Sequence, residues 1–289
     1  MRDLPEVEGV SHRWVRARGL DFHVAEAGEG EDVVLCLHGW PQHWYEWRHL
    51  MRALADRHRV LAMDLRGFGW SDAPREGYEK ENMADDVLAV LDQLGLERVK
   101  LVAHDWGGWI GFLLGMRAAD RFSRYLALNI LHPWMTPRAM APHLWRFWYQ
   151  WVILAPGLGY ELHRSGRFIP RVLVGGSSNK DVWDEETIHA FSDRFTAPER
   201  ARAAVQMYRV FNLKETMPIF GGRYMDERLE VPTRLVFGAD DFALRPQLLA
   251  GYERHAEDMQ VELVPGCGHF IADERAELVA ERAREFLST

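Results

Sequence analysis

Leu101-Val102-Ala103-His104-Asp105-Trp106-Gly107-Gly108 is the stretch of sequence that decides the predicted fold. The apolar run at 99–103 predicts a short buried strand, and residues 110–116 predict the helix that follows it. Small residues at positions 103, 107 and 108 indicate a tight turn, where larger side chains would collide with the backbone of the crossing helix. A strand, a sharp turn and a helix are the setting of a nucleophile elbow, which usually reads G-x-S-x-G. Aspartate occupies the central position here, so the stretch also fits a plain turn in which Asp105 caps the helix.

Buried strands and helices alternate along most of the remaining chain. Residues 32–37 are continuously apolar, which is typical of a strand that is covered on both faces. The alternation predicts a parallel sheet wrapped by helices and preceded by a hairpin that turns at Arg18-Gly19. Between about 132 and 226 the alternation breaks into an aromatic- and proline-rich region, which predicts a helical insertion with a flexible loop at 174–179. The other expected elements are strands at 13–18, 20–26, 60–63, 125–130, 233–237 and 260–264, and helices at 44–55, 81–94, 245–255 and 274–287.

The composition is that of a globular protein with an acidic balance. With 289 residues, 47% of them hydrophobic, the chain can bury a substantial core. A net charge of −8 without a basic cluster argues against nucleic acid as a partner. No apolar run reaches the roughly 18 to 20 residues that span a bilayer, and no signal peptide is visible, so we expect a cytoplasmic protein. Cys36 and Cys267 have no metal-site spacing, and the scarcity of lysine suggests a GC-rich bacterial genome.

A carboxylate and a histidine follow two later strands in the order that a nucleophile elbow requires. Asp240 and Asp241 come after the strand that ends at 237, and His269 comes after the next strand. Both loops lie at the carboxyl ends of strands, where open α/β sheets place their sites. Asp105, Asp241 and His269 are therefore candidates for nucleophile, orienting acid and base. Asp240 competes for the role of the acid, and its position favours Asp241.

These motifs resemble those of the α/β-hydrolases, in particular the epoxide hydrolase branch, which also includes the haloalkane dehalogenases. The resemblance covers nearly the whole chain: His38-Gly39-Trp40-Pro41 is similar to the family's oxyanion motif, and residues 103–108 to its elbow. It implies a mostly parallel eight-stranded sheet flanked by helices, with a helical lid inserted after the sixth strand. The implied domains are a hydrolase core at 1–131 and 227–289 and a lid at 132–226.

An aspartate nucleophile suits attack on saturated carbon. Its reference pKa of about 3.9 keeps it ionised at neutral pH, so it can displace a leaving group and form an alkyl ester. The histidine is then needed for the second half, where it removes a proton from the water that attacks the ester. The family pattern assigns the oxyanion donors to the backbone N–H groups of Trp40 and Trp106. A conventional esterase or lipase is therefore disfavoured.

Opening an epoxide also needs an acid near the ring oxygen, because the alkoxide that forms is strongly basic. The resemblance implies two lid tyrosines for this role, and the chain offers Tyr208 and Tyr149 in similar segments. A phenol with a reference pKa of about 10 is protonated at neutral pH and can donate. Asn212 stands one position from the family spacing, and Tyr160 and His143 are further candidates.

We therefore predict an epoxide hydrolase that converts lipophilic epoxides and water to vicinal diols. The expected substrate-binding residues are Trp40, Trp106, Tyr149 and Tyr208, in a pocket made apolar by tryptophans. Trp109 is expected to pack in the core. No cofactor or metal is expected, because the thirteen histidines show no H-E-x-x-H or similar spacing.

Other functions stay open at this point. A haloalkane dehalogenase would use the same nucleophile and base, with Trp106 and a second halide donor. That donor is usually an asparagine in place of Trp40, or a lid tryptophan such as one of Trp134, Trp145 and Trp151. A haloacid dehalogenase would need an arginine near the elbow, where this chain has Trp106 and Trp109. A non-catalytic binding protein of the same fold would lack a triad member, and none is missing.

Overall fold

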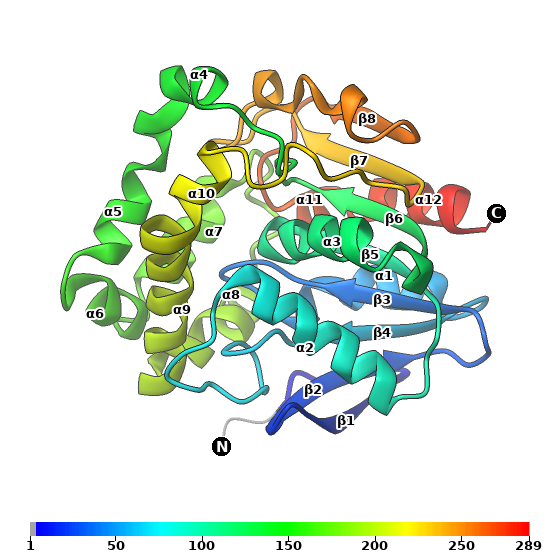
Figure 1. Ribbon diagram of the computed structural model, residues 1–289. Helices are drawn as coiled ribbons and strands as arrows, with labels where there is room; N and C mark the ends of the chain where they lie inside the picture. The colour runs from blue at the N-terminus through cyan, green and yellow to red at the C-terminus, as the bar shows by residue number, and fades with distance from the viewer. Residues whose placement is uncertain (1–3, 289) are drawn as a thin grey trace.

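An eight-stranded sheet is formed within residues 4–288, the part of the chain described by this computed structural model (Figure 1). The strand order is β1-β2-β4-β3-β5-β6-β7-β8. β2 runs antiparallel to β1 and β4, and the other neighbouring pairs are parallel. The mostly parallel eight-stranded sheet and the hairpin turn at Arg18-Gly19 are thus confirmed. The strands are Val10–Ala17, Leu20–Ala27, Val33–Leu37, Arg59–Met63, Val99–His104, Phe122–Leu128, Thr233–Gly238 and Met259–Val264 for β1 to β8.

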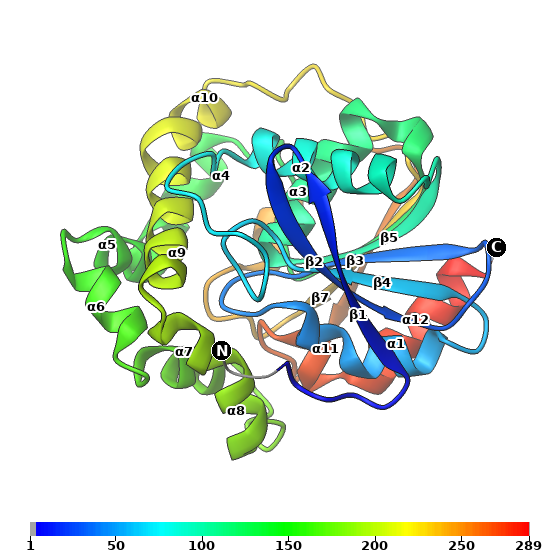
Figure 2. The ribbon, with the colours of Figure 1, turned by 90° about the horizontal axis from the view of Figure 1, so that it is seen from below.

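Helices cover both faces of this sheet, which explains why the central strands are apolar throughout. Every residue of β3 is buried, and β5 is buried except for Lys100. Figure 2 shows α2 and α3 on one face and α1, α11 and α12 on the other. The covering helices are α1 Arg48–Leu54, α2 Lys80–Gln93, α3 Asp105–Arg117, α11 Ile271–Glu274 and α12 Ala276–Leu287. A sheet buried on both faces positions whatever follows its strands with little freedom.

The chain between β6 and β7 is helical and lies beyond the carboxyl ends of the parallel strands (Figure 1). No strand occurs between 132 and 226, all of which the structure describes. We call this region the insertion. Its α-helices are α4 Pro137–Met140, α5 Trp148–Leu154, α6 Leu158–Arg164, α7 Phe168–Gly176, α8 Glu185–Ser192, α9 Pro198–Val210 and α10 Thr216–Phe220. A 3₁₀ segment, Ala141–Phe147, precedes α5, and a π-helical segment, Phe211–Glu215, follows α9.

Two predictions of local structure are wrong. The helix expected at 245–255 is instead a pair of short 3₁₀ turns, Pro246–Leu249 and Tyr252–Arg254, separated by Gly251 with a φ of 96°. The loop expected at 174–179 begins only at 177, because residues 174–176 are the end of α7, and Ser177 Oγ donates to Leu173 O over 2.9 Å. Within residues 4–288, no helix is long and apolar enough to cross a membrane.

Candidate active site

Asp105 is the first residue of α3 and follows β5 without an intervening loop. Its φ of 47° lies in the left-handed region, which costs an L-residue about 1–2 kcal/mol. Such strain persists where the surrounding structure enforces it, commonly at functional sites. The first turn of α3 also places its carboxylate beside backbone N–H groups that have no partner within the helix. The strand and helix predicted around the elbow are confirmed, and the helix begins at the aspartate itself.

The elbow is packed closely against the end of β3. A Cβ on Gly107 would lie 2.3 Å from Leu37 O, so the side chain excluded there would meet strand backbone rather than helix backbone. This approach brings the loop after β3 next to the carboxylate, and Trp40 N donates to Asp105 Oδ2 over 2.9 Å. The Trp106 amide lies in the first turn of α3. Of the two amides assigned to an oxyanion hole, that of Trp40 therefore contacts the carboxylate, and that of Trp106 belongs to the next residue of the chain.

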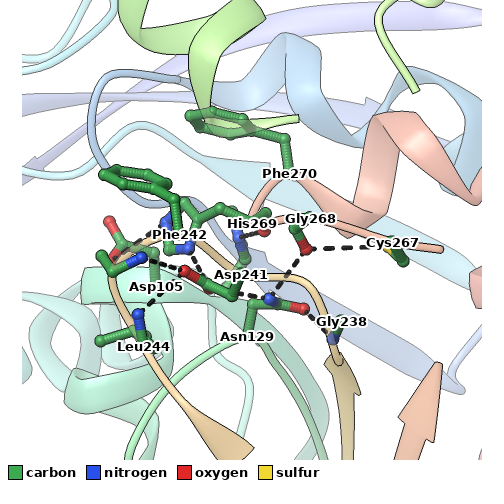
Figure 3. A network of polar contacts seen from close by, with 12 residues as sticks. Asp105, Asn129, Gly238, Asp241, Phe242, Leu244, Cys267, Gly268, His269 and Phe270 are labelled. Carbon is green, nitrogen blue, oxygen red and sulfur yellow. Dashed lines mark hydrogen bonds and ion pairs between the residues drawn. The ribbon is translucent and has the colours of Figure 1, made fainter. Parts of the chain in front are cut away.

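Asp241 and His269 meet at the carboxyl edge of the sheet (Figure 3). His269 Nδ1 lies 2.7 Å from Asp241 Oδ2, and His269 Nε2 lies 3.7 Å from Asp105 Oδ1. Burial opposes the charged imidazole, but the Asp241 carboxylate and its hydrogen bond outweigh it and raise the pKa of His269. Burial also opposes the Asp241 charge, but His269 and backbone N–H donors lower the pKa of that carboxyl. Asp240 is exposed, so the geometry selects Asp241 as the partner.

Asn129 joins the acid loop to the histidine loop. Its Nδ2 donates to Asp241 Oδ2 and to Gly268 O, both over 3.0 Å, and its Oδ1 accepts from Gly238 N (Figure 3). It has a φ of 38°, and it directly follows β6. The sequence offers one weak signal for Asn129, namely a polar residue at the end of an apolar run.

Glu274 holds the histidine loop against the insertion. Its carboxylate accepts from the N–H groups on both sides of His269, those of Gly268 and Phe270, over 3.0 and 3.1 Å. It also accepts from the N–H groups of Ser178 and Asn179. A Cβ on Gly268 would lie 2.5 Å from Gly176 O, so only glycine permits this contact. The sequence offered no pattern that marks Glu274.

A buried ion pair lies beneath the histidine. His104 Nδ1 is 2.7 Å from Glu46 Oε1, with both side chains fully buried, and His104 Nε2 is 2.9 Å from His269 O. Burial opposes the charge on His104, but Glu46 raises the pKa of His104 to about 9. The imidazolium donates to the backbone carbonyl of His269, so His104 and Glu274 both hold the histidine loop in place.

A cavity of about 360 Å³ opens at Asp105, between the core and the insertion. Its lining is mostly apolar and aromatic and includes Trp106 and Trp109. Within residues 4–288, no arginine or lysine lines it, so a substrate carboxylate would have no cation to pair with. Trp109 is buried as predicted, with its ring against Phe211, but it also faces this cavity.

Both predicted tyrosines line the same cavity. Tyr208 comes from α9 and Tyr149 from α5, and their ring centroids lie 6.3 Å apart at an interplanar angle of 85°. Burial raises the pKa of both phenols, so they remain protonated at neutral pH. The structure therefore places two phenolic donors in the cavity that holds the Asp105 carboxylate.

Asn212 and Gln150 connect the two tyrosine segments. Asn212 Nδ2 donates to Tyr208 O over 2.9 Å and to Gln150 Oε1 over 3.0 Å. Gln150 Nε2 lies 3.5 Å from the Tyr149 hydroxyl. The π-helical segment that contains Asn212 has a wider turn than an α-helix, which fits the one-residue departure from the family spacing.

Lys80 is fully buried next to Trp106. Its Nζ lies 4.6 Å from the Trp106 ring centroid and 3.2 Å from Glu215 Oε2, and it also contacts Met207 O. Since Met207 precedes Tyr208, this ammonium joins α2 of the core to the segment that carries the tyrosine. Burial lowers the pKa of Lys80 despite Glu215. Like Glu274, it had no recognisable signal in the sequence.

The remaining candidates lie outside the cavity lining. The Trp40 side chain, expected to bind substrate, is absent from the lining but packs edge-on against Tyr208, with the ring centroids 5.3 Å apart, and its Nε1 donates to His163 Nε2 over 3.2 Å. Burial lowers the pKa of His163 to about 4, which keeps that nitrogen an acceptor. His143, Tyr160, Trp134 and Trp145 are likewise absent from the lining, and of the tryptophans named as possible halide donors in the lid only Trp151 is present. Within residues 4–288, no group of three or more His, Cys, Asp or Glu side chains could hold a metal ion.

The sequence matches the family described as alpha/beta hydrolase fold over residues 32–276, and the chain belongs to that family. Among curated relatives, it is 29% identical to a soluble epoxide hydrolase of Corynebacterium sp. (strain C12), over 96% of this chain and 98% of the relative. A crystal structure of an epoxide hydrolase from Vigna radiata superposes with a TM-score of 0.85 at 27% identity, covering 98% and 99% of the two chains. Cfl2 of Burkholderia cenocepacia superposes with a TM-score of 0.87 at 25% identity, covering 99% and 98%.

Proposed function

We propose that this chain is an epoxide hydrolase that converts lipophilic epoxides to vicinal diols through a covalent ester on Asp105. The similarity to epoxide hydrolases along nearly the whole chain supports the reaction class. One observation carries the mechanism: a carboxylate bonded by a backbone N–H and two buried phenols line a single apolar cavity. Such a cavity holds both a nucleophile for carbon and an acid for the departing oxygen.

In the first step, Asp105 Oδ1 attacks an epoxide carbon and the carbon–oxygen bond of the ring breaks. Oδ2 is the oxygen that Trp40 N–H already binds, so Oδ1 is the one free to react. Tyr208 or Tyr149 gives its proton to the alkoxide as the bond breaks. A phenol placed at the ring oxygen stabilises charge that develops only in the transition state.

In the second step, His269 takes a proton from water while the water oxygen attacks Cγ of Asp105. The charge that develops on Oδ2 is stabilised by the backbone N–H groups of Trp40 and Trp106. The ester bond then breaks, and the leaving diol oxygen takes the proton back from His269. The Asp105 carboxyl loses its proton and the phenolate regains one through solvent, so the sum is epoxide plus water to diol.

The surroundings of the cavity support the choice of an uncharged, lipophilic substrate. The lining provides aromatic and aliphatic contacts to aryl or alkyl groups, and it lacks a cation, so anionic substrates such as haloacids are disfavoured. We further propose that residues 132–226 act as a lid over a core formed by 1–131 and 227–289, because the insertion supplies both tyrosines. We also expect the protein to work in the cytoplasm, without a cofactor.

A haloalkane dehalogenase reaction is a second candidate, and the Trp106 indole favours it. Its Nε1 is buried and has no acceptor in hydrogen-bond geometry within residues 4–288, although it acts on the pKa of the nearby Tyr208 hydroxyl. A halide leaving from carbon could accept this N–H. The Trp40 indole, however, is engaged with His163, so the second donor that usually completes a halide site is weaker here.

A single turnover in H₂¹⁸O tests the proposal, with enzyme in excess over a styrene-type epoxide. The oxygen added to the diol should be unlabelled, because it comes from Asp105, and the label should appear in the peptide that contains Asp105. Label in the diol during this first turnover would contradict the ester mechanism. A parallel reaction with a bromoalkane measures halide release; turnover of that substrate but not of the epoxide would favour the second candidate.

A further inference from the structure

Three tryptophans on the outer side of the insertion expose most of their side chains. Trp145, Trp148 and Trp151 are 66%, 61% and 64% exposed. They lie at spacings of three residues along a 3₁₀ segment and α5, which places them on neighbouring positions of one helical face. We call these three residues, with the exposed Leu144 and Leu158, the tryptophan face. Figures 1 and 2 show α5 and α6 on the side of the insertion that is farthest from the sheet.

Contiguous exposed aromatic surface of this kind marks an interaction site rather than ordinary surface variation. Tryptophan is especially suited to the boundary between water and lipid, since its ring is apolar and its N–H is polar. The helices that carry these tryptophans lie on the outer side of the insertion, so a partner can approach them without displacing the core.

The charge of this region differs from that of the chain as a whole. Residues 132–174 contain five arginines and one glutamate, a formal net charge of +4, in a chain whose net charge is −8. Four of these arginines are exposed, namely Arg138, Arg164, Arg167 and Arg171. Arginine near a tryptophan-rich face is complementary to an anionic surface. It would also repel a second copy of the same face, because a two-fold pairing brings equal charges together.

The tryptophan face continues into the rim of the cavity. Leu144 and Trp151 are exposed and also line the cavity at Asp105. Met217 of α10 is 74% exposed and lines the cavity as well. A planar apolar surface against this face would therefore lie beside the mouth of the cavity.

From these contacts we propose that the tryptophan face docks the protein onto an anionic lipid bilayer and holds the cavity mouth against the lipid. The tryptophans enter the boundary between headgroups and acyl chains, and the arginines pair with anionic headgroups. The docking proposal depends only on this surface. We further infer that the docked protein takes lipophilic epoxides directly from the bilayer, and this inference also rests on the proposed function.

Flotation of the full chain with lipid vesicles tests the docking. Vesicles of phosphatidylcholine with a quarter phosphatidylglycerol should carry the protein at low salt, and phosphatidylcholine vesicles should carry much less. The variant Trp145→Ser/Trp148→Ser changes two residues that do not line the cavity, and it should reduce binding by about tenfold or more. Arg164→Gln/Arg167→Gln should weaken binding and its salt dependence. Trp14→Ser is the matched control, because Trp14 is 51% exposed on β1 and lies outside the face.

All three variants should keep the turnover of a water-soluble epoxide, and this measurement separates the two proposals. Loss of vesicle binding with normal turnover supports docking through this face. Absence of wild-type binding to anionic vesicles, or equal binding to neutral ones, overturns the proposal whatever the enzyme activity. A concentration-dependent dimer of the wild type that Trp145→Ser/Trp148→Ser abolishes would overturn it too, since a second copy would then cover the face.

Discussion

The candidate site has a core side and an insertion side, which we call its two walls, and they are built in different ways. On the core side, Asp105, Asp241 and His269 are held by short polar contacts, and Asn129 and Glu274 fix the loops that carry them. On the insertion side, the rings of Tyr149 and Tyr208 pack against aromatic neighbours, and their hydroxyls interact with each other, with Trp106 and, over 3.5 Å, with Gln150 Nε2. Hydrogen bonds fix direction, whereas apolar packing mainly fixes volume.

This difference separates the two half-reactions that we propose. Ester hydrolysis depends on His269, whose position is fixed by several hydrogen bonds, so the rate of this step should be sensitive to changes in those bonds. Ring opening depends on two phenols that share a proton-donating task in an adaptable apolar wall. Substitutions on the core side should therefore slow ester hydrolysis, and substitutions on the insertion side should slow ring opening.

His269→Gln should have the largest effect, because it removes the base and leaves the nucleophile. Steady-state turnover should fall by about 10⁴-fold, while Asp105 is still alkylated. Intact-mass measurement should then show a stable adduct with the mass of the epoxide. His143→Gln is the control, because His143 is a histidine of the 3₁₀ segment Ala141–Phe147 and is not the partner of Asp241. Loss of adduct formation in His269→Gln would show that the two walls do not act separately.

Asp241→Asn should lower turnover by about 10³-fold and change its pH dependence. The base must be neutral to accept a proton, and its pKa lies above the ordinary 6.5 because Asp241 outweighs burial. Wild-type ester hydrolysis should therefore decline as the pH falls through a value above 6.5. Without the carboxylate, burial dominates and lowers the pKa of His269, so this limb should move to lower pH. Asp240→Asn should not change the pH at which ester hydrolysis declines. A shift to higher pH in Asp241→Asn would refute the role of Asp241 as the partner of His269.

Tyr208→Phe should slow ring opening by about 10²-fold, and leave ester hydrolysis unchanged. The effect is smaller because Tyr149 still donates from the same cavity. Stopped-flow measurement of alkylation and of ester decay separates the two rates. Tyr160→Phe is the matched control, since that tyrosine of the insertion does not line the cavity. An unchanged alkylation rate in Tyr208→Phe would remove this residue from the mechanism.

Glu274→Gln should have the smallest effect, about tenfold, and only on ester hydrolysis. The amide replaces one accepting oxygen by a donor, so some of the four N–H groups around the histidine loop lose their partner. Alkylation should proceed at the wild-type rate, because Asp105 is not part of this network. Glu277→Gln, an exposed change three residues further on, should be neutral. Equal loss in both steps would indicate general disorder rather than misplacement of His269.

The sequence predicts the core well because its signals are local. Continuous apolar runs predict buried strands. The elbow, Asp241 and His269 lie at the carboxyl ends of strands, and the topology of the sheet brings these ends together. The helix expected at 245–255 does not form, because Gly251 has a left-handed backbone conformation that separates two short 3₁₀ turns. The stretch 174–179 contains the small and polar residues of a mobile loop, yet its backbone is bonded to Glu274 far along the chain.

The residues that support the site could not be predicted, because their contacts are not local in sequence. Glu274, Lys80 and Asn129 act through partners that are distant in sequence, and each would pass for an ordinary surface or strand-end residue. The hydrogen bond from the Trp40 indole to His163 likewise joins residues that are distant in sequence. Pairings of this kind arise from tertiary packing and leave no period or spacing in the chain.

The contact between α7 and the histidine loop limits how the insertion can move. His269 N donates to Gly176 O over 2.9 Å, and the turn after Gly176 is bonded to Glu274. Lifting this end of the insertion would displace His269, so we expect the α7 end to stay in place when the insertion moves. Exchange of substrate and diol would then take place at the exposed part of the cavity lining, where Trp151 and Met217 lie. His269 would keep its contact with Asp241 during this exchange.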